Sequence, residues 1–242
     1  MIEELLPESV VAVEAHADDH TEGTGSTAGP TPYPELYPGE EALIARAVEK
    51  RRREFTVVRG CARRAMEKLG VPPQAVLTGD RGAPRWPAGL IGSMTHCEGY
   101  AAAALARAAD LASLGIDAEP HRPLPDDVLS SVALPDEVRR LGVLAGHHPR
   151  IHWDRLLFSA KESVYKAWFP LTGKWLDFSE ADIEVFMDPG HTTSGGLSAG
   201  LLVPGPVVDG RRIGRFEGRW TMDRGLVATS VTVPHGVSHG RD

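Results

Sequence analysis

The sequence predicts an α+β protein, because helical and strand-like segments follow one another without the regular strand–helix–strand rhythm of a parallel sheet. Two segments, 40–69 and 153–168, carry apolar residues at helical spacing. Alternation of apolar and polar residues, typical of strands, occurs in segment 111–119 and in three short segments after residue 176. A chain of 242 residues that is 42% hydrophobic can form one large domain or two small ones.

The first helical segment, residues 40–69, also positions basic side chains. We expect a break near Gly60, because glycine weakens a helix. At about 100° per residue, Arg51 falls inside the apolar stripe and Arg59 at its edge, whereas Lys50 points away. The two inward arginines either face an anion or pack their stems while their guanidinium groups extend to water. The stripe itself consists of Ile44, Val48, Phe55, Val58, Ala62, Met66 and Leu69.

Charge balance and cysteine content limit the functions that are compatible with the sequence. The formal net charge of −7 comes from 33 acidic and 26 basic residues, so we expect no non-specific binding of nucleic acid. Two cysteines, Cys61 and Cys97, are too few for a disulfide framework and suit a reducing interior. The acidic start, and the lack of an apolar run of about 18 residues, predict a cytoplasmic protein without a membrane span.

Three carboxylates form the candidate catalytic centre. In segment 111–119, Asp117 and Glu119 lie on one face of the predicted strand, opposite its apolar face. Glu162 lies on the polar side of the second helical segment, four residues before Lys166. Carboxylate oxygens suit a magnesium ion that bridges substrate phosphates. Without a metal, the same residues are explained as a solvated strand face and a surface ion pair on a helix.

Other histidines and cysteines are weaker candidates. Segment 15–38, rich in Gly, Thr, Pro, Asp and His, is expected to be an irregular loop, which argues against a helical metal pair of His16 and His20. His96 follows a turn and is either a loop residue satisfied by the backbone or a ligand. Cys97 is not expected to be a nucleophile, because adjacent residues seldom point the same way. The sequence has no glycine-rich phosphate loop, so side chains must hold any phosphate-bearing substrate.

Four short motifs follow one another between residues 51 and 168. Residues 115–119 read Gly-Ile-Asp-Ala-Glu, and residues 158–168 read Phe-Ser-Ala-Lys-Glu-Ser-Val-Tyr-Lys-Ala-Trp. Upstream lie Ser-Met-Thr-His at 93–96 and a basic stretch at 50–59. Together they resemble the motifs of 4′-phosphopantetheinyl transferases, in particular the large, pseudo-dimeric class that activates surfactin- and enterobactin-type synthetases. That class serves peptide, polyketide and siderophore synthases.

The resemblance implies a role for each matching residue of the carboxylate centre. Asp117, Glu119 and Glu162 would be metal ligands, with magnesium as the metal and manganese as the alternative. Glu162 would also be the general base, and Lys161 and Lys166 would contact the phosphates of coenzyme A. The expected catalytic residues are therefore Glu162, Lys166 and Asp117.

The resemblance also implies an anion site for the 3′-phosphate of coenzyme A. Many family members carry a lysine between the glycine and the proline of a Gly-Lys-Pro turn, where this chain has Ala83. We expect Arg81, just before the glycine, to supply that charge. The other residues expected at the coenzyme A site are Arg51, Arg59, Thr95 and His96.

The fold and activity implied by the resemblance are specific. Two similar α+β lobes, residues 1–112 and 113–242, are expected in a pseudo-twofold arrangement with the active site in the cleft between them. The enzyme would transfer the 4′-phosphopantetheine arm of coenzyme A to a serine of an acyl or peptidyl carrier protein, release 3′,5′-ADP, and act as a monomer. The alternatives are a non-catalytic module that binds coenzyme A or a carrier protein, and a magnesium-dependent phosphohydrolase or nucleotidyl transferase.

Overall fold

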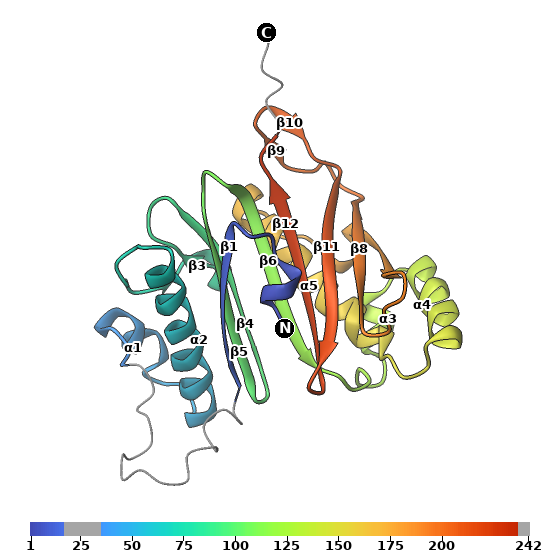
Figure 1. Cartoon of the computed structure of the whole chain (residues 1–242), viewed down its shortest axis with the longest axis horizontal. Helices are drawn as coiled ribbons and strands as arrows, with labels where there is room; N and C mark the ends of the chain where they lie inside the picture. Colours follow the sequence, from blue (N-terminus) through green and yellow to red (C-terminus); the bar gives the residue numbers. More distant parts are fainter. Residues whose placement is uncertain (17–34, 237–242) are drawn as a thin grey trace.

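The computed structural model describes residues 1–16 and 35–236 of the chain. These residues form a three-stranded and a five-stranded antiparallel sheet, which lie side by side (Figure 1). One helix of 20 residues packs against each sheet. The expected α+β class, with two halves of similar construction, is therefore confirmed. Most of the expected loop at 15–38, including His20, lies outside the described residues.

The smaller sheet is built around a strand of small residues. Its strands, in spatial order, are β1 (Val10–His16), β5 (Tyr100–Arg107) and β4 (Leu90–Cys97). Ala103 and Leu105 of β5 pack beneath helix α2 (Glu49–Lys68), whereas Ala102, Ala104 and Ala106 belong to the core on the opposite face of the sheet, since side chains alternate along a strand. Between α2 and β4 the chain forms β2 (Leu77–Thr78), a 3₁₀ turn (Asp80–Gly82) and β3 (Pro84–Arg85).

The first helical segment is broken, but the break expected at Gly60 is wrong. Helix α1 (Pro38–Ile44) ends well before α2 begins at Glu49, and Gly60 lies buried inside α2. The Arg52 guanidinium donates to the Ile44 carbonyl oxygen at 3.0 Å, so a side chain of the second helix satisfies the end of the first. Packing of α2 on the sheet outweighs the cost of one glycine, which is about 1 kcal/mol.

The larger sheet carries the remaining helices. Its strands, in spatial order, are β6 (Leu111–Pro120), β12 (Leu226–Pro234), β11 (Arg215–Asp223), β8 (Ser194–Leu201) and β7 (Ala181–Met187). Helix α5 (Trp153–Thr172) packs across β6 and β12, and a core around Trp220 fills the space between helix and sheet. The shorter elements are α3 (Val128–Val132), α4 (Pro135–His147), the 3₁₀ turn η4 (Phe178–Glu180), β9 (Val207–Val208) and β10 (Arg211–Arg212).

Strand β8 was not predicted, because its glycine-rich sequence is not one of the three alternating segments expected after residue 176. Two of its glycines are required by close packing: a Cβ atom on Gly195 would lie 2.0 Å from the Phe186 carbonyl oxygen, and one on Gly196 would lie 2.3 Å from the Phe186 ring. Small residues in this strand therefore make room for Phe186 on the neighbouring strand.

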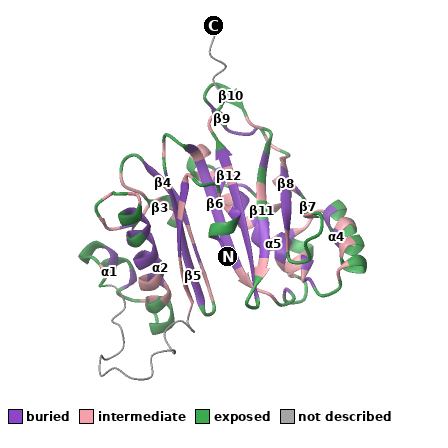
Figure 2. Ribbon diagram, viewed as in Figure 1, coloured by how far each residue is buried: buried purple, intermediate pink, exposed green. Residues whose placement is uncertain are grey.

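The two sheets meet at β4 and β6, which are edge strands of their respective sheets. Side-chain hydroxyls replace the usual backbone ladder there. The amide of Ile116 donates to Ser93 Oγ at 3.1 Å, and the amide of Ala118 donates to Thr95 Oγ1 at 3.1 Å. Figure 2 shows that β6 and β12 are buried over most of their length. The junction of the two halves is therefore part of the protein interior.

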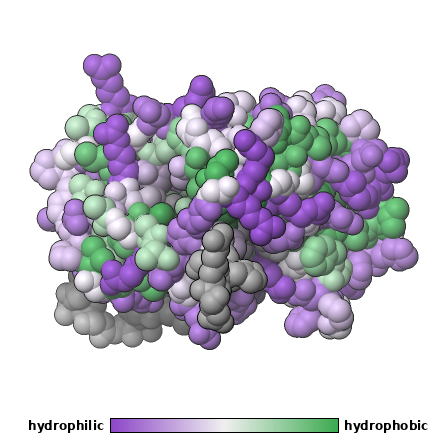
Figure 3. All heavy atoms as spheres, turned by 90° about the horizontal axis from the view of Figure 1, so that it is seen from above, coloured by the Kyte–Doolittle hydropathy of each residue, from purple (hydrophilic) through white to green (hydrophobic). Residues whose placement is uncertain are grey.

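The face of the molecule shown in Figure 3 is predominantly polar. On the face shown in Figure 3, small apolar patches are separated by hydrophilic side chains. Across residues 1–16 and 35–236, no helix combines the length and apolar character needed to cross a membrane.

Candidate active site

A cavity of about 510 Å³ lies at the junction of the two sheets. Its walls come from α2, the turn at 78–86, β4, β6 and α5. Among the residues predicted from the sequence, Glu119 and Lys161 do not line it. The predicted residues that do line it are Arg51, Arg59, Arg81, Thr95, His96, Asp117, Glu162 and Lys166.

Asp117 is held in a fixed orientation by its neighbours. It is 5% exposed, and its Oδ1 accepts hydrogen bonds from Lys166 Nζ at 2.7 Å and from Thr95 Oγ1 at 3.2 Å. Lys166 Nζ also donates to the Ile116 carbonyl at 3.0 Å. The other carboxylate oxygen, Asp117 Oδ2, is buried and finds no hydrogen-bond partner among the described residues. Since a buried charged oxygen without a partner is costly, this atom is suited to bind a ligand.

The other two carboxylates have different surroundings. Glu162 lines the cavity, and burial raises its pKa, with the Lys166 ammonium opposing and Asp117 reinforcing this effect. Glu119 accepts a hydrogen bond from Arg155 Nη1 at 3.0 Å. Burial, followed by the charge of Asp117, raises the pKa of Glu119, and Arg155 opposes the rise. Asp117 is therefore close enough to both glutamates to disfavour their ionisation.

Two of these three carboxylates, Asp117 and Glu162, are suited to bind a hard divalent cation. Within the described part of the chain, no group of three His, Cys, Asp or Glu side chains is already arranged as a metal site. Asp117 offers an unpartnered buried oxygen, and Glu162 faces the same cavity. Magnesium commonly takes one or two carboxylates and completes its octahedron with water and substrate phosphates. Glu119 does not line the cavity, and one of its oxygens, Oε2, is held by Arg155.

Basic residues from two elements meet in the cavity wall. Arg51 Nη1 of α2 contacts His96 Nε2 of β4. The carboxylate of Glu54 lies 3.8 Å from each of these nitrogens. Burial lowers the pKa of His96, and Arg51 adds to the decrease while Glu54 opposes it. A phosphate at this place would compete with Glu54 for the same two partners.

Arg59 is buried beside this pair. It is 6% exposed, and its guanidinium carbon lies 3.5 Å from the centroid of the Phe55 ring. Burial lowers the pKa of Arg59 to about 10. Its Nε is buried and has no hydrogen-bond partner in the described residues. Arg59 therefore faces the cavity rather than water, as expected if it binds an anion.

Arg81 reaches the cavity from the turn between α2 and β4. Its backbone adopts a left-handed conformation with φ of 53°, and its guanidinium carbon lies 5.7 Å from the ring centroid of Trp175. Burial raises the pKa of the nearby Tyr165, and Arg81 counteracts the rise. Arg81 therefore supplies a positive charge two residues before Ala83, where many family members have a lysine.

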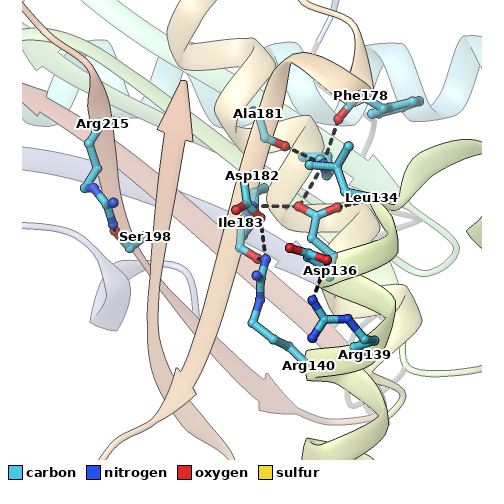
Figure 4. A network of polar contacts seen from close by, with 12 residues as sticks. Leu134, Asp136, Arg139, Arg140, Phe178, Ala181, Asp182, Ile183, Ser198 and Arg215 are labelled. Atoms are coloured by element: carbon cyan, nitrogen blue, oxygen red, sulfur yellow. Dashed lines mark hydrogen bonds and ion pairs between the residues drawn. The ribbon is translucent and has the colours of Figure 1, made fainter. Parts of the chain in front are cut away.

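Lys161 lies outside the cavity, contrary to the expected contact with the phosphates of coenzyme A. The side chain is buried, and its ammonium donates to the carbonyl oxygens of Phe178 at 2.7 Å and Ala181 at 2.6 Å. The third partner is Glu137 Oε1 at 2.9 Å. Figure 4 shows the segments that form this network, with the Phe178 and Ala181 carbonyls directed toward one centre. With three acceptors engaged, Lys161 has no donor left for coenzyme A.

Thr95 and Cys97 have structural roles in β4. The Thr95 hydroxyl donates to Asp117 and accepts from the Ala118 amide, so it fixes the acid. Burial, followed by the charges of Glu119 and Asp117, raises the pKa of Cys97 to about 12. A thiol with this pKa is protonated at neutral pH, which agrees with the expectation that Cys97 is not a nucleophile.

Three residues of the site were not predicted. Glu54 lies within the basic stretch at 50–59, where the charge pattern emphasised arginines. Tyr165 lines the cavity with a buried hydroxyl, and in the sequence it appears only as part of the motif at 158–168. Arg155 carried no sequence signal, because its partners, Glu119 and the carbonyls of residues 122 and 123, are brought to it only by folding.

Comparison with protein families gives two matches that cover most of the described chain. The family model of the 4′-phosphopantetheinyl transferase N-terminal domain matches residues 39–106. The model of the 4′-phosphopantetheinyl transferase superfamily matches residues 113–198. The cavity is lined by residues from both matched regions.

Three characterised relatives align over nearly the whole chain. The 4′-phosphopantetheinyl transferase Svp of Streptomyces mobaraensis is 55% identical, covering 96% of this chain and 89% of its own length. Npt of Nocardia iowensis is 46% identical, covering 96% of this chain and 99% of its own length. PptT of Mycobacterium tuberculosis is 43% identical over 96% of this chain and 98% of its own length. Npt and PptT are also named as 4′-phosphopantetheinyl transferases.

Proposed function

Because this chain belongs to the 4′-phosphopantetheinyl transferase superfamily, we propose that it transfers the 4′-phosphopantetheine arm of coenzyme A to a serine of an acyl or peptidyl carrier protein. A bond forms between the serine oxygen and the β-phosphorus of coenzyme A, the bond from that phosphorus to the bridging oxygen breaks, and 3′,5′-ADP leaves. The single observation that carries the assignment is one cavity that contains both an acidic group, Asp117 and Glu162, and a basic group, Arg51, Arg59 and His96.

The acidic group and Lys166 would act on the diphosphate. Glu162, directly or through a water molecule, takes the proton of the serine hydroxyl, and its raised pKa suits a general base. Lys166, fixed by Asp117 at 2.7 Å, stabilises negative charge on the transferred phosphoryl group. A divalent cation, which we take to be magnesium rather than manganese, would supply further charge neutralisation when bound by Asp117 and Glu162. Glu119 would be an additional ligand in this proposal, through its second carboxylate oxygen, Oε1.

The basic group would bind the 3′-phosphate of coenzyme A. Arg51, Arg59 and His96 offer guanidinium and imidazole donors on one wall of the cavity. Arg81 is proposed to contact a phosphate from the turn at 78–86, and Thr95 acts through Asp117. The division into lobes at residues 112 and 113, the monomeric state and the cytoplasmic location remain predictions.

Mass spectrometry of an intact apo carrier protein tests the reaction. We expect the carrier to gain the mass of one phosphopantetheine arm when it is incubated with the chain, coenzyme A and magnesium, and we expect EDTA to prevent the gain. Release of inorganic phosphate or pyrophosphate from coenzyme A without carrier modification would indicate a phosphohydrolase instead. Binding of coenzyme A without modification of several unrelated carriers would indicate a binding module.

Replacing Arg51 by glutamine should weaken coenzyme A binding about tenfold, since a charge-assisted hydrogen bond contributes about 1.5–3 kcal/mol and this side chain is half exposed. The dissociation constants of coenzyme A and of dephospho-coenzyme A, measured by calorimetry, check this directly. Dephospho-coenzyme A lacks the 3′-phosphate and should bind both proteins equally well. Lys50→Gln is the matched control, because Lys50 is exposed and points away from the cavity. An equal loss for both ligands would place the 3′-phosphate elsewhere.

A further inference from the structure

Lys161 precedes the proposed general base in the sequence but belongs to a different environment. Its ammonium is almost completely buried and donates to Glu137 of α4, to the carbonyl of Phe178 in η4 and to the carbonyl of Ala181 at the start of β7. These contacts join α5 to three other elements. The segments that carry them lie side by side in Figure 4.

Glu137 completes this network. Its Oε1 accepts from the Ile183 amide at 2.6 Å as well as from Lys161, and its Oε2 accepts from the Leu134 amide at 2.7 Å. Glu137 is 1% exposed. A buried ion pair with every oxygen and every ammonium hydrogen engaged permits little variation in the position of either side chain.

Helix α5 is therefore fixed on two opposite sides around Glu162. On one side its backbone touches β6 at Gly115, where an added Cβ would lie 2.0 Å from the Ser163 carbonyl oxygen. Residues two apart in a helix point about 200° apart, so Lys161 anchors the side opposite Ser163. Glu162 lies between these two contacts and faces the cavity.

We propose that Lys161 is a positioning residue whose buried contacts with Glu137, Phe178 and Ala181 set the orientation of Glu162 toward the cavity. This inference rests on the proposed function, because it assigns Glu162 to the reaction and to the metal. Displacing a catalytic group by about 1 Å can cost about 100-fold in rate, and loss of supporting contacts to a metal ligand typically costs 10–100-fold in metal affinity or activity.

The test uses the full chain with Lys161→Met, which keeps the stem and removes the ammonium, and with Lys161→Met combined with Glu137→Leu, which leaves no buried charge unpaired. The control is Arg140→Met, which removes contacts of α4 with Asp182 and with the Ile183 carbonyl at the same junction. Each protein is assayed for kcat and for the KM of coenzyme A. Calorimetric titration with Mg²⁺ in the absence of carrier gives a reading that does not depend on turnover.

We expect the double variant to fold, to lose about tenfold or more in kcat, to bind Mg²⁺ about tenfold more weakly, and to keep its KM for coenzyme A within about twofold. Arg140→Met should keep all three values near those of the wild type. A folded double variant with wild-type kcat and Mg²⁺ affinity would overturn the proposal and leave Lys161 a purely structural residue. If the wild type modifies no carrier, the proposed function fails, and the Mg²⁺ titration still decides whether Lys161 positions Glu162.

Discussion

Replacing Glu162 by glutamine is expected to lower kcat for carrier modification by about 10²–10⁴-fold, with little change in the KM for coenzyme A. Glutamine keeps the shape of the side chain but cannot take a proton from serine and is a poorer cation ligand. Steady-state kinetics with a purified carrier measure both constants. Glu184→Gln on β7 is the matched control, because that glutamate is exposed and away from the cavity. A Glu162→Gln enzyme that retains wild-type kcat would remove Glu162 from the reaction.

The same substitution should not destabilise the protein at neutral pH. Burial raises the pKa of Glu162, so in metal-free buffer the folded state binds the proton more tightly than the unfolded state. The contribution of this group to stability is therefore greatest at low pH and is lost as the pH rises through the folded-state pKa. Because glutamine does not ionise, the Glu162→Gln protein does not lose stability in this way. Its thermal midpoint in EDTA should equal or exceed that of the wild type near pH 7. A clearly lower midpoint would contradict the direction of the pKa shift.

Local sequence pattern was sufficient for the elements whose burial follows from their own periodicity. Helix α5 and strand β6 were predicted, with Asp117 on the strand face opposite its apolar residues and Glu162 on the polar side of the helix, and the structure brings both carboxylates to one cavity. The alternative of a solvated strand face is wrong for Asp117, which is buried. A surface ion pair of Glu162 with Lys166 is also wrong, because Lys166 pairs with Asp117, 49 residues earlier.

The features that could not be predicted from the sequence depend on contacts between residues far apart in the chain. Lys161 belongs to a motif whose resemblance suggested phosphate contact, but α4 and β7 enclose it, and neither contact has a signature near residue 161. Strand β8 lacks an alternating pattern because Gly195 and Gly196 accommodate Phe186 on the adjacent strand. Glu54 was missed because its relation to His96 depends on the meeting of α2 with β4. In each case the partner lies in another element, so periodicity could not show it.

Replacing Gly115 by alanine should damage both stability and activity. The new Cβ would lie 2.0 Å from the Ser163 carbonyl oxygen and 2.8 Å from the Ala167 nitrogen, and both are backbone atoms that can yield only if α5 moves away from β6. Overpacking of this kind costs about 1–3 kcal/mol. Asp117 lies on β6 whereas Glu162 and Lys166 lie on α5, so the same shift separates the acids from each other.

For Gly115→Ala we therefore expect a lower midpoint in urea unfolding and a kcat reduced about tenfold or more, since catalytic groups lose rate steeply with displacement. Gly142→Ala is the matched control: Gly142 lies in helix α4, and apart from the adjacent residues and nearby backbone of that helix, an added Cβ meets no described atom within 4 Å. That change should stabilise the protein by about 0.5–1 kcal/mol, because alanine is the better helix former. A Gly115→Ala protein as stable and active as the wild type would mean that the separation of α5 from β6 does not govern the site.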